Sequence, residues 1–153
     1  MEYYFRGDFV IGFLASIIAG AVMSLQGVFN TKLSESIGLY ESNVFVQGSA
    51  FAFSLLAMLF LGKGSFTAIK GVNLLYLSGG LLGVVITITV MLGISKLNPT
   101  TAISVILISQ LICAALIDAF GLFGAEKIAF NFKNYLGIAL MISGIIVFKL
   151  ANR

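Results

Sequence analysis

The residues with most scope for chemistry are four polar side chains that lie inside apolar stretches of the sequence. Gln26 and Asn30 are four residues apart in one stretch, and Gln110 and Asp118 are eight apart in another, with Ala114 midway between them. Residues four apart share a face of an α-helix. Amides that donate and accept hydrogen bonds, beside a carboxyl that can take up a proton, would suit a site that binds a polar solute.

Asp118 is the only carboxylate inside a long apolar run. A negative charge is disfavoured near the C-terminal end of a helix and in apolar surroundings, so both conditions favour the protonated form of this carboxyl. We therefore expect Asp118 to bind and release a proton that is exchanged for the solute. The alternative is that Asp118 reaches interfacial water, or pairs with Lys127 beyond the helix end.

Gln26, Asn30 and Gln110 are expected to line a central substrate site. An uncharged amide in a bilayer must find a hydrogen-bond partner or lose free energy. The alternative is therefore a structural one, in which Gln26 or Asn30 bonds to Gln110 and only holds helices together. Gln47, near the start of its stretch, is expected to meet headgroups or water.

The elements that position these residues follow from composition. Of the 153 residues, 59% are hydrophobic and 10% charged, and mean hydropathy is +1.09; a soluble domain carries about 25% charged residues. The apolar stretches do not alternate in polarity as barrel strands do. We predict an all-α integral membrane protein, a single membrane domain over residues 1–153. Its five transmembrane helices are expected at about 9–31, 43–62, 73–95, 100–121 and 134–150.

Helix boundaries can be read from cap and turn residues. Ser42 and Asn43 are expected to cap the second helix, and the run 62–65, Gly-Lys-Gly-Ser, to stop it. Pro99 is the only proline, and it is best placed in the first turn of the fourth helix, where its missing N–H costs nothing.

Small residues recur at every fourth position in two of the helices. One stripe is Gly12, Ser16, Gly20 and Ser24, and a second is Gly79, Gly83 and Thr87. Such stripes let helix backbones approach closely in lipid, so we expect them to pack against other helices.

Several classes of function are not expected. The chain has no histidine and a single cysteine, and it has no nucleotide-binding loop and no nucleophile with a paired base. We therefore expect no enzyme activity, no metal site and no cofactor. The net charge of +3 comes from scattered basic residues, which suit contact with anionic membrane lipid and give no sign of nucleic-acid binding.

The distribution of basic residues bears on orientation in the membrane. Lys and Arg number five on the N-terminal side of the helices and four on the other: Arg6, Lys63, Lys70, Lys127 and Lys133 against Lys32, Lys96, Lys149 and Arg153. A difference of one gives almost no orientation signal. Insertion in both senses is therefore expected, with a single weakly biased orientation as the alternative. Two oppositely inserted copies would form a ten-helix inverted-repeat assembly, with a binding site between the halves.

The order of several short motifs carries a family resemblance. These are residues 24–33 (SLQGVFNTKL), residues 79–83 (GGLLG), Gln110, residues 118–124 (DAFGLFG), and Gly137 with Gly144. Together they resemble the five-helix YdcZ-like branch of the drug/metabolite transporter superfamily. The resemblance implies an inner-membrane, multi-pass transporter that is half of a ten-helix inverted repeat. Such a half pairs with an inverted copy of itself, as an antiparallel homodimer, or with a paralogous five-helix subunit.

Two departures limit what the resemblance transfers. Ser109 stands before Gln110, where members commonly have glycine, and the first helix has no acid to match the proton-coupling glutamate of related small multidrug exporters. Our interpretation is a secondary-active transporter subunit that moves a small organic solute by alternating access, with Asp118 as its proton site. The alternative is a non-transport assembly or channel-like subunit, in which the polar residues only hold helices together.

Overall fold

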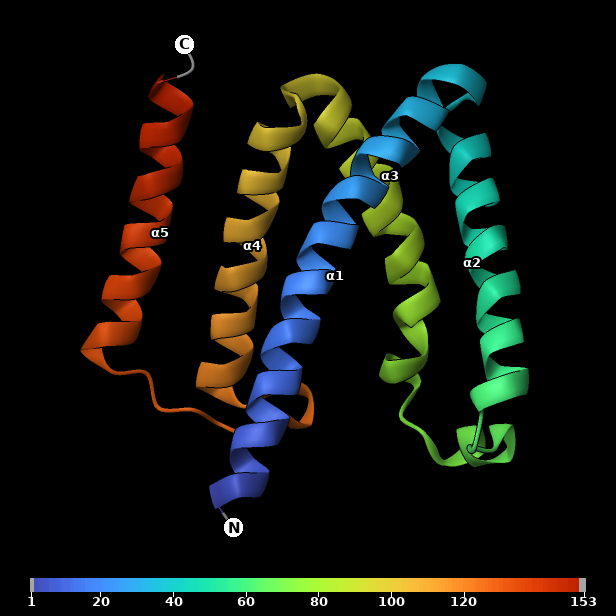
Figure 1. Ribbon diagram of the computed structural model, residues 1–153, viewed down its shortest axis with the longest axis horizontal. Coiled ribbons are helices and arrows are strands. Elements are labelled where there is room, and N and C mark those ends of the chain that lie inside the picture. Colours follow the sequence, from blue (N-terminus) through green and yellow to red (C-terminus); the bar gives the residue numbers. More distant parts are fainter. Residues whose placement is uncertain (1, 152–153) are drawn as a thin grey trace. The chain divides into compact units, whose positions relative to one another are not determined.

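The computed structural model describes residues 2–151, and the side chains of residues 7–150, as helices joined by short connections (Figure 1). Five helices, each with its adjoining turns, are long and apolar enough to cross a membrane. They are α1 (Glu2–Ile37), α2 (Leu39–Leu61), α3 (Gly79–Leu97), α4 (Pro99–Phe120) and α5 (Phe132–Ala151). Short 3₁₀ helices at Phe66–Gly71, Leu74–Ser78 and Leu122–Gly124 complete the order. The prediction of an all-α protein with five apolar helices is confirmed.

Local cap chemistry fixes the start of α4 and α5. The side chain of Asn98 accepts a hydrogen bond from the Thr101 N–H at 3.1 Å, and Pro99 occupies the first helical turn. The expectation that Pro99 marks a helix start is confirmed. In front of α5, Asn131 accepts from the Asn134 N–H, and Asn134 accepts in return from the Asn131 N–H. This reciprocal pair satisfies two of the free donors at the helix N-terminus.

The expectation that Ser42 and Asn43 cap α2 is wrong. The helix begins at Leu39 with Gly38 at its N-cap, so both side chains lie inside the helix, where they are buried. Gly38 is the single residue between α1 and α2, and its φ of 101° lies in the region that glycine adopts without strain. A one-residue turn therefore replaces the longer connection expected over residues 32–42.

The described chain separates into two compact units, Met1–Lys96 and Leu97–Arg153. In the first, α1 and α2 contact each other, and in the second α4 contacts α5. A close approach also joins α1 to α3, because a methyl group placed on Gly27 would lie 2.9 Å from Cδ1 of Ile94 and 3.2 Å from Cγ1 of Val90. The single membrane domain expected over the whole chain stays a prediction.

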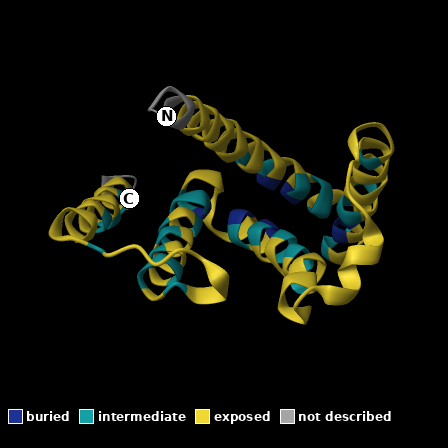
Figure 2. Ribbon diagram, turned by 90° about the horizontal axis from the view of Figure 1, so that it is seen from below, coloured by how far each residue is buried: buried dark blue, intermediate teal, exposed yellow. Residues whose placement is uncertain are grey.

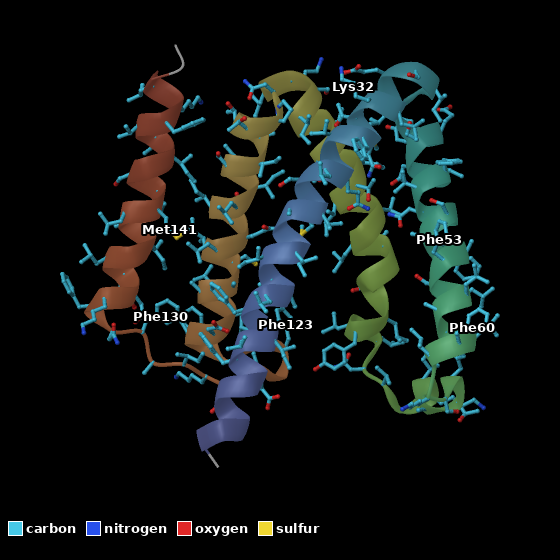
Figure 3. All side chains as sticks on the ribbon, in the orientation of Figure 1. Lys32, Phe53, Phe60, Phe123, Phe130 and Met141 are labelled. Atoms are coloured by element: carbon cyan, nitrogen blue, oxygen red, sulfur yellow. The ribbon has the colours of Figure 1, made fainter. Side chains whose placement is uncertain are left out.

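Most described side chains are exposed, and few residues are buried (Figure 2). Phe53 and Phe60 of α2 point away from α3 (Figure 3) and are 72% and 82% exposed. Apolar surface of this extent would drive aggregation in water, whereas it matches the hydrocarbon of a bilayer. The helices are therefore held together by close packing and hydrogen bonds, since burying apolar surface drives little association in lipid.

Candidate functional site

The two amides of α1 lie beside the buried face of that helix. Gln26 is exposed and Asn30 half-buried, while Gly27 and Thr31, each one residue further along, are buried. The Thr31 hydroxyl donates to the Gly27 carbonyl at 2.7 Å, so this face meets α3 without a free donor. Gln26 and Asn30 therefore flank the α1–α3 contact, and Gln26 projects out of it.

The second predicted face lies on α4, in the other unit. Gln110 is exposed, and Asp118 is half-buried in the last turn of the helix. No other charged residue stands between Pro99 and Phe120. The expected meeting of Gln26 and Asn30 with Gln110 joins residues of two different units, and it stays a prediction.

The chain folds back over the C-terminal end of α4, beside Asp118. The Ile128 N–H donates to the Asp118 carbonyl at 2.9 Å, and Gly121 ends the helix in the left-handed conformation, with φ 63°. Side-chain space at Gly121 is filled, because a methyl group there would lie 3.2 Å from Cβ of Lys127. Among the described residues the ion pair that forms is Lys32–Glu35, at 2.8 Å on the surface of α1, and Asp118 does not form one with Lys127.

A hydrogen-bonded chain links α2 to α3. The Gln47 amide Nε2 donates to the Thr87 hydroxyl at 3.2 Å, and that hydroxyl donates to the Gly83 carbonyl at 2.9 Å. Gly83 leaves room for this contact, since a methyl group placed on it would lie 3.6 Å from Gln47 Nε2. Gln47 therefore makes an interhelical bond, instead of meeting only headgroups or water as expected.

Buried polar side chains gather where α1 ends and α2 begins. Thr31 is 3% exposed, Ser42 0% and Asn43 7%. Ser42 Oγ and Asn43 Oδ1 have no hydrogen-bond partner. A buried polar atom without a partner costs about 1–3 kcal/mol, so this pair calls for a functional or structural explanation.

The stripes of small residues differ in their surroundings. On α1 the Ser16 and Ser24 hydroxyls donate to the carbonyls of Gly12 and Gly20, at 2.8 and 3.0 Å. Methyl groups placed on Gly12, Gly20 or Gly79 would meet nothing within 4 Å, whereas Gly83 faces Gln47. Within a single chain, the α1 stripe thus presents an open surface whose hydroxyls are already bonded.

The interhelical bond of Gln47 and the burial of Ser42 and Asn43 were not predicted from the sequence. A signal was present, because Asn43 and Gln47 are four apart on α2, as Gly83 and Thr87 are on α3. The cap prediction failed because of the one-residue turn at Gly38, which places Ser42 and Asn43 inside the helix and away from a cap position.

The polar groups of this arrangement can form hydrogen bonds, and a carboxyl can take up and release a proton. No group of three or more Cys, Asp or Glu side chains that could hold a metal ion is found among the described residues. The polar atoms are amides, hydroxyls and the Asp118 carboxyl. These groups suit recognition of a polar solute, and a carboxyl near a helix end suits proton exchange.

Comparisons with known proteins identify a family. The family model described as "Putative inner membrane exporter, YdcZ" matches residues 11–147. No curated protein matches the chain, and no solved structure matches it. The match covers nearly all of the described helices, and it confirms the resemblance seen in the sequence motifs. With five helices able to cross a bilayer, the chain belongs to this YdcZ family and is a multi-pass protein of the inner membrane.

Proposed function

We propose that the protein is a subunit of a secondary-active exporter that moves a small organic solute by alternating access. The observation that carries the proposal is the match to an inner-membrane exporter family over residues 11–147, on a chain with five apolar helices. An ion gradient is the proposed driving force. The proposal includes no enzyme activity and no cofactor.

The working unit is proposed to be two copies in opposite orientations, or one copy with a paralogous five-helix subunit. Support comes from polar side chains that the single chain leaves uncovered. Gln26 and Gln110 are exposed on apolar helices, and an amide that faces hydrocarbon loses its hydrogen bonds. The open α1 stripe at Gly12 and Gly20 offers a surface on which a second helix could approach closely.

Gln26, Asn30 and Gln110 are proposed to contact the solute, and Asp118 to carry the coupling proton. The support for this role is that Asp118 is the one charged residue of α4 and lies half-buried in its last turn. Protonation would remove a charge that apolar surroundings disfavour, and loss of the proton on the other side would reset the carrier.

The test is transport by the purified protein in liposomes with an imposed pH gradient, using a panel of small organic solutes. Asp118→Asn keeps the size and polarity of the side chain but cannot take up a proton, so proton-driven transport should fall to the level of protein-free liposomes. Asp8→Asn is the matched control, since Asp8 is exposed near the start of α1, and it should leave transport unchanged. Transport by Asp118→Asn with its pH dependence intact would remove the proton-coupling role.

A further inference from the structure

The first two turns of α2 contain two buried oxygen atoms, Ser42 Oγ and Asn43 Oδ1, that have no hydrogen-bond partner. Other hydroxyls nearby behave differently. Ser49, seven residues further along α2, donates to the Val46 carbonyl at 3.0 Å, and Thr31 of α1 donates to Gly27 at 2.7 Å. The Gly38 carbonyl, one turn before Ser42, accepts a hydrogen bond from the backbone N–H of Ser42 and not from its hydroxyl.

The two atoms are also closed to solvent in this conformation. Ser42 is 0% exposed and Asn43 7%. A water molecule that could satisfy both, by donating to Asn43 Oδ1 and exchanging a hydrogen bond with the Ser42 hydroxyl, cannot reach them here. The conformation therefore gives up hydrogen bonds that a slightly more open arrangement would restore.

The turn between α1 and α2 provides the means of opening. Gly38 is the single residue that interrupts the two helices, and it lies at φ 101°, ψ 156°. The two helices contact each other. A change of backbone angles at one such residue is enough to swing two rigid helices apart.

We propose that the α1–α2 end is a gate that water opens. In the closed form seen here Ser42 Oγ and Asn43 Oδ1 are dry and unpaired, and in the open form both are hydrated. The lost hydrogen bonds bias the gate toward opening, and an apolar pair at these positions would hold it shut. The gate rests on the proposed function only in that alternating access requires such an opening; the tests below do not measure transport.

The first test measures opening directly. In a Cys113→Ser background, Ser42→Cys is labelled in membranes with a water-soluble maleimide, and slow but complete labelling is expected. Adding Asn43→Leu, close to Asn in size and without its oxygen, should lower the labelling rate about fivefold or more. Ser36→Cys, exposed near the C-terminal end of α1, is the matched reporter and should be labelled at the same rate with and without Asn43→Leu.

The second test measures the cost of the closed form. Ser42→Ala should raise Tm in detergent, because it removes a buried hydroxyl that has no partner, while Ser49→Ala should not raise it, because that hydroxyl is bonded. The proposal is overturned if Ser42→Ala lowers Tm, if Ser42→Cys is never labelled, or if Asn43→Leu leaves its labelling rate unchanged. Failure of these tests would leave the proposed transport function standing, and loss of transport alone would leave the gate standing.

Discussion

Gln47 donates a hydrogen bond from α2 to Thr87 of α3, and Thr87 passes a hydrogen bond on to its own helix at Gly83. Interhelical bonds of this kind contribute about 0.6 kcal/mol on average in membrane proteins. Such a bond nevertheless makes helix packing specific, because it fixes which faces of two apolar helices meet. Gln47 and Thr87 are accordingly expected to set the register of α2 against α3.

A double-mutant cycle tests this pair. Gln47→Leu and Thr87→Val should each lower the stability of the protein in detergent, and together they should cost less than the sum by about 0.6 kcal/mol. Thr89→Val is the control, since the Thr89 hydroxyl bonds within α3 to Val85 and Ile86. Thermal or denaturant unfolding provides the readout, and strictly additive effects would show that the two side chains do not support each other.

At the scale of residues, the sequence shows where polar side chains occur along a helix, but it does not show which residues they contact. The spacing of Gln26 with Asn30, and of Gln110 with Asp118, places each pair on one face of its helix, and the structure does form these two helices. Which neighbour a face meets depends on helix rotation and on turn length, and neither is written in the spacing. Gln47 shows the result, because its partner lies 40 positions away in the chain.

At the scale of elements, the C-terminal end of α4 depends on one backbone conformation. Gly121 closes the helix with φ 63°, and its N–H bonds to the Ile117 carbonyl. The loop then returns to place the Ile128 N–H on the Asp118 carbonyl. The position of the Asp118 side chain therefore depends on how this turn is closed.

Replacing this glycine should be costly. Gly121→Ala forces an L-residue into the left-handed region, at about 1–2 kcal/mol, and the added methyl group would press on Lys127. A lower Tm in detergent is expected. Gly64→Ala is the matched control, because Gly64 lies in a connection where a methyl group meets nothing within 4 Å, and its Tm should be unchanged. Equal melting of the two variants would contradict the role of the turn.

Elements themselves were largely predictable, because apolar length marks each span and Pro99 and Gly62 mark boundaries. The exceptions lie where tertiary structure overrides a local signal. Ser42 and Asn43 favour a cap by residue type, yet the turn at Gly38 starts α2 three residues earlier than Ser42. The stretch expected as one helix over 73–95 instead opens with a 3₁₀ helix at Leu74–Ser78, capped by the Asn73 side chain, before α3 begins at Gly79.

At the scale of the whole molecule, exposed amides at Gln26 and Gln110 and open space at Gly12 and Gly20 favour association with a second subunit. The near-equal basic residues on the two sides, five and four, allow both orientations. Two oppositely oriented copies could each cover the exposed amides and the α1 stripe of the other. A monomer would lack the second, inverted half whose movement relative to the first alternating access requires.

Dual insertion is tested with a cysteine in the connection after α2. Ser65→Cys in the Cys113→Ser background should be labelled by a membrane-impermeant reagent in intact cells to about half the level reached after permeabilisation, because a weak charge bias populates both orientations. The Cys113→Ser parent is the control and should take up no label. Labelling from one side only would remove dual insertion, and crosslinking in lipid that finds only monomers would favour the assembly or channel-like subunit.

The length of α1 has a physical consequence for the membrane around it. The helix segment that contains its membrane span, Gly7–Ile37, has 31 residues against 19 to 24 in the other four. That is about 46 Å of helix at 1.5 Å per residue, and its ends carry the charged residues Asp8, Lys32 and Glu35. The hydrocarbon layer is about 30 Å thick. Because the charged residues at both ends of α1 favour water, the excess length extends beyond the hydrocarbon or is accommodated by tilt. The C-terminal end of α1, with its Lys32–Glu35 ion pair, is therefore expected outside the hydrocarbon, together with the turn at Gly38 that follows it.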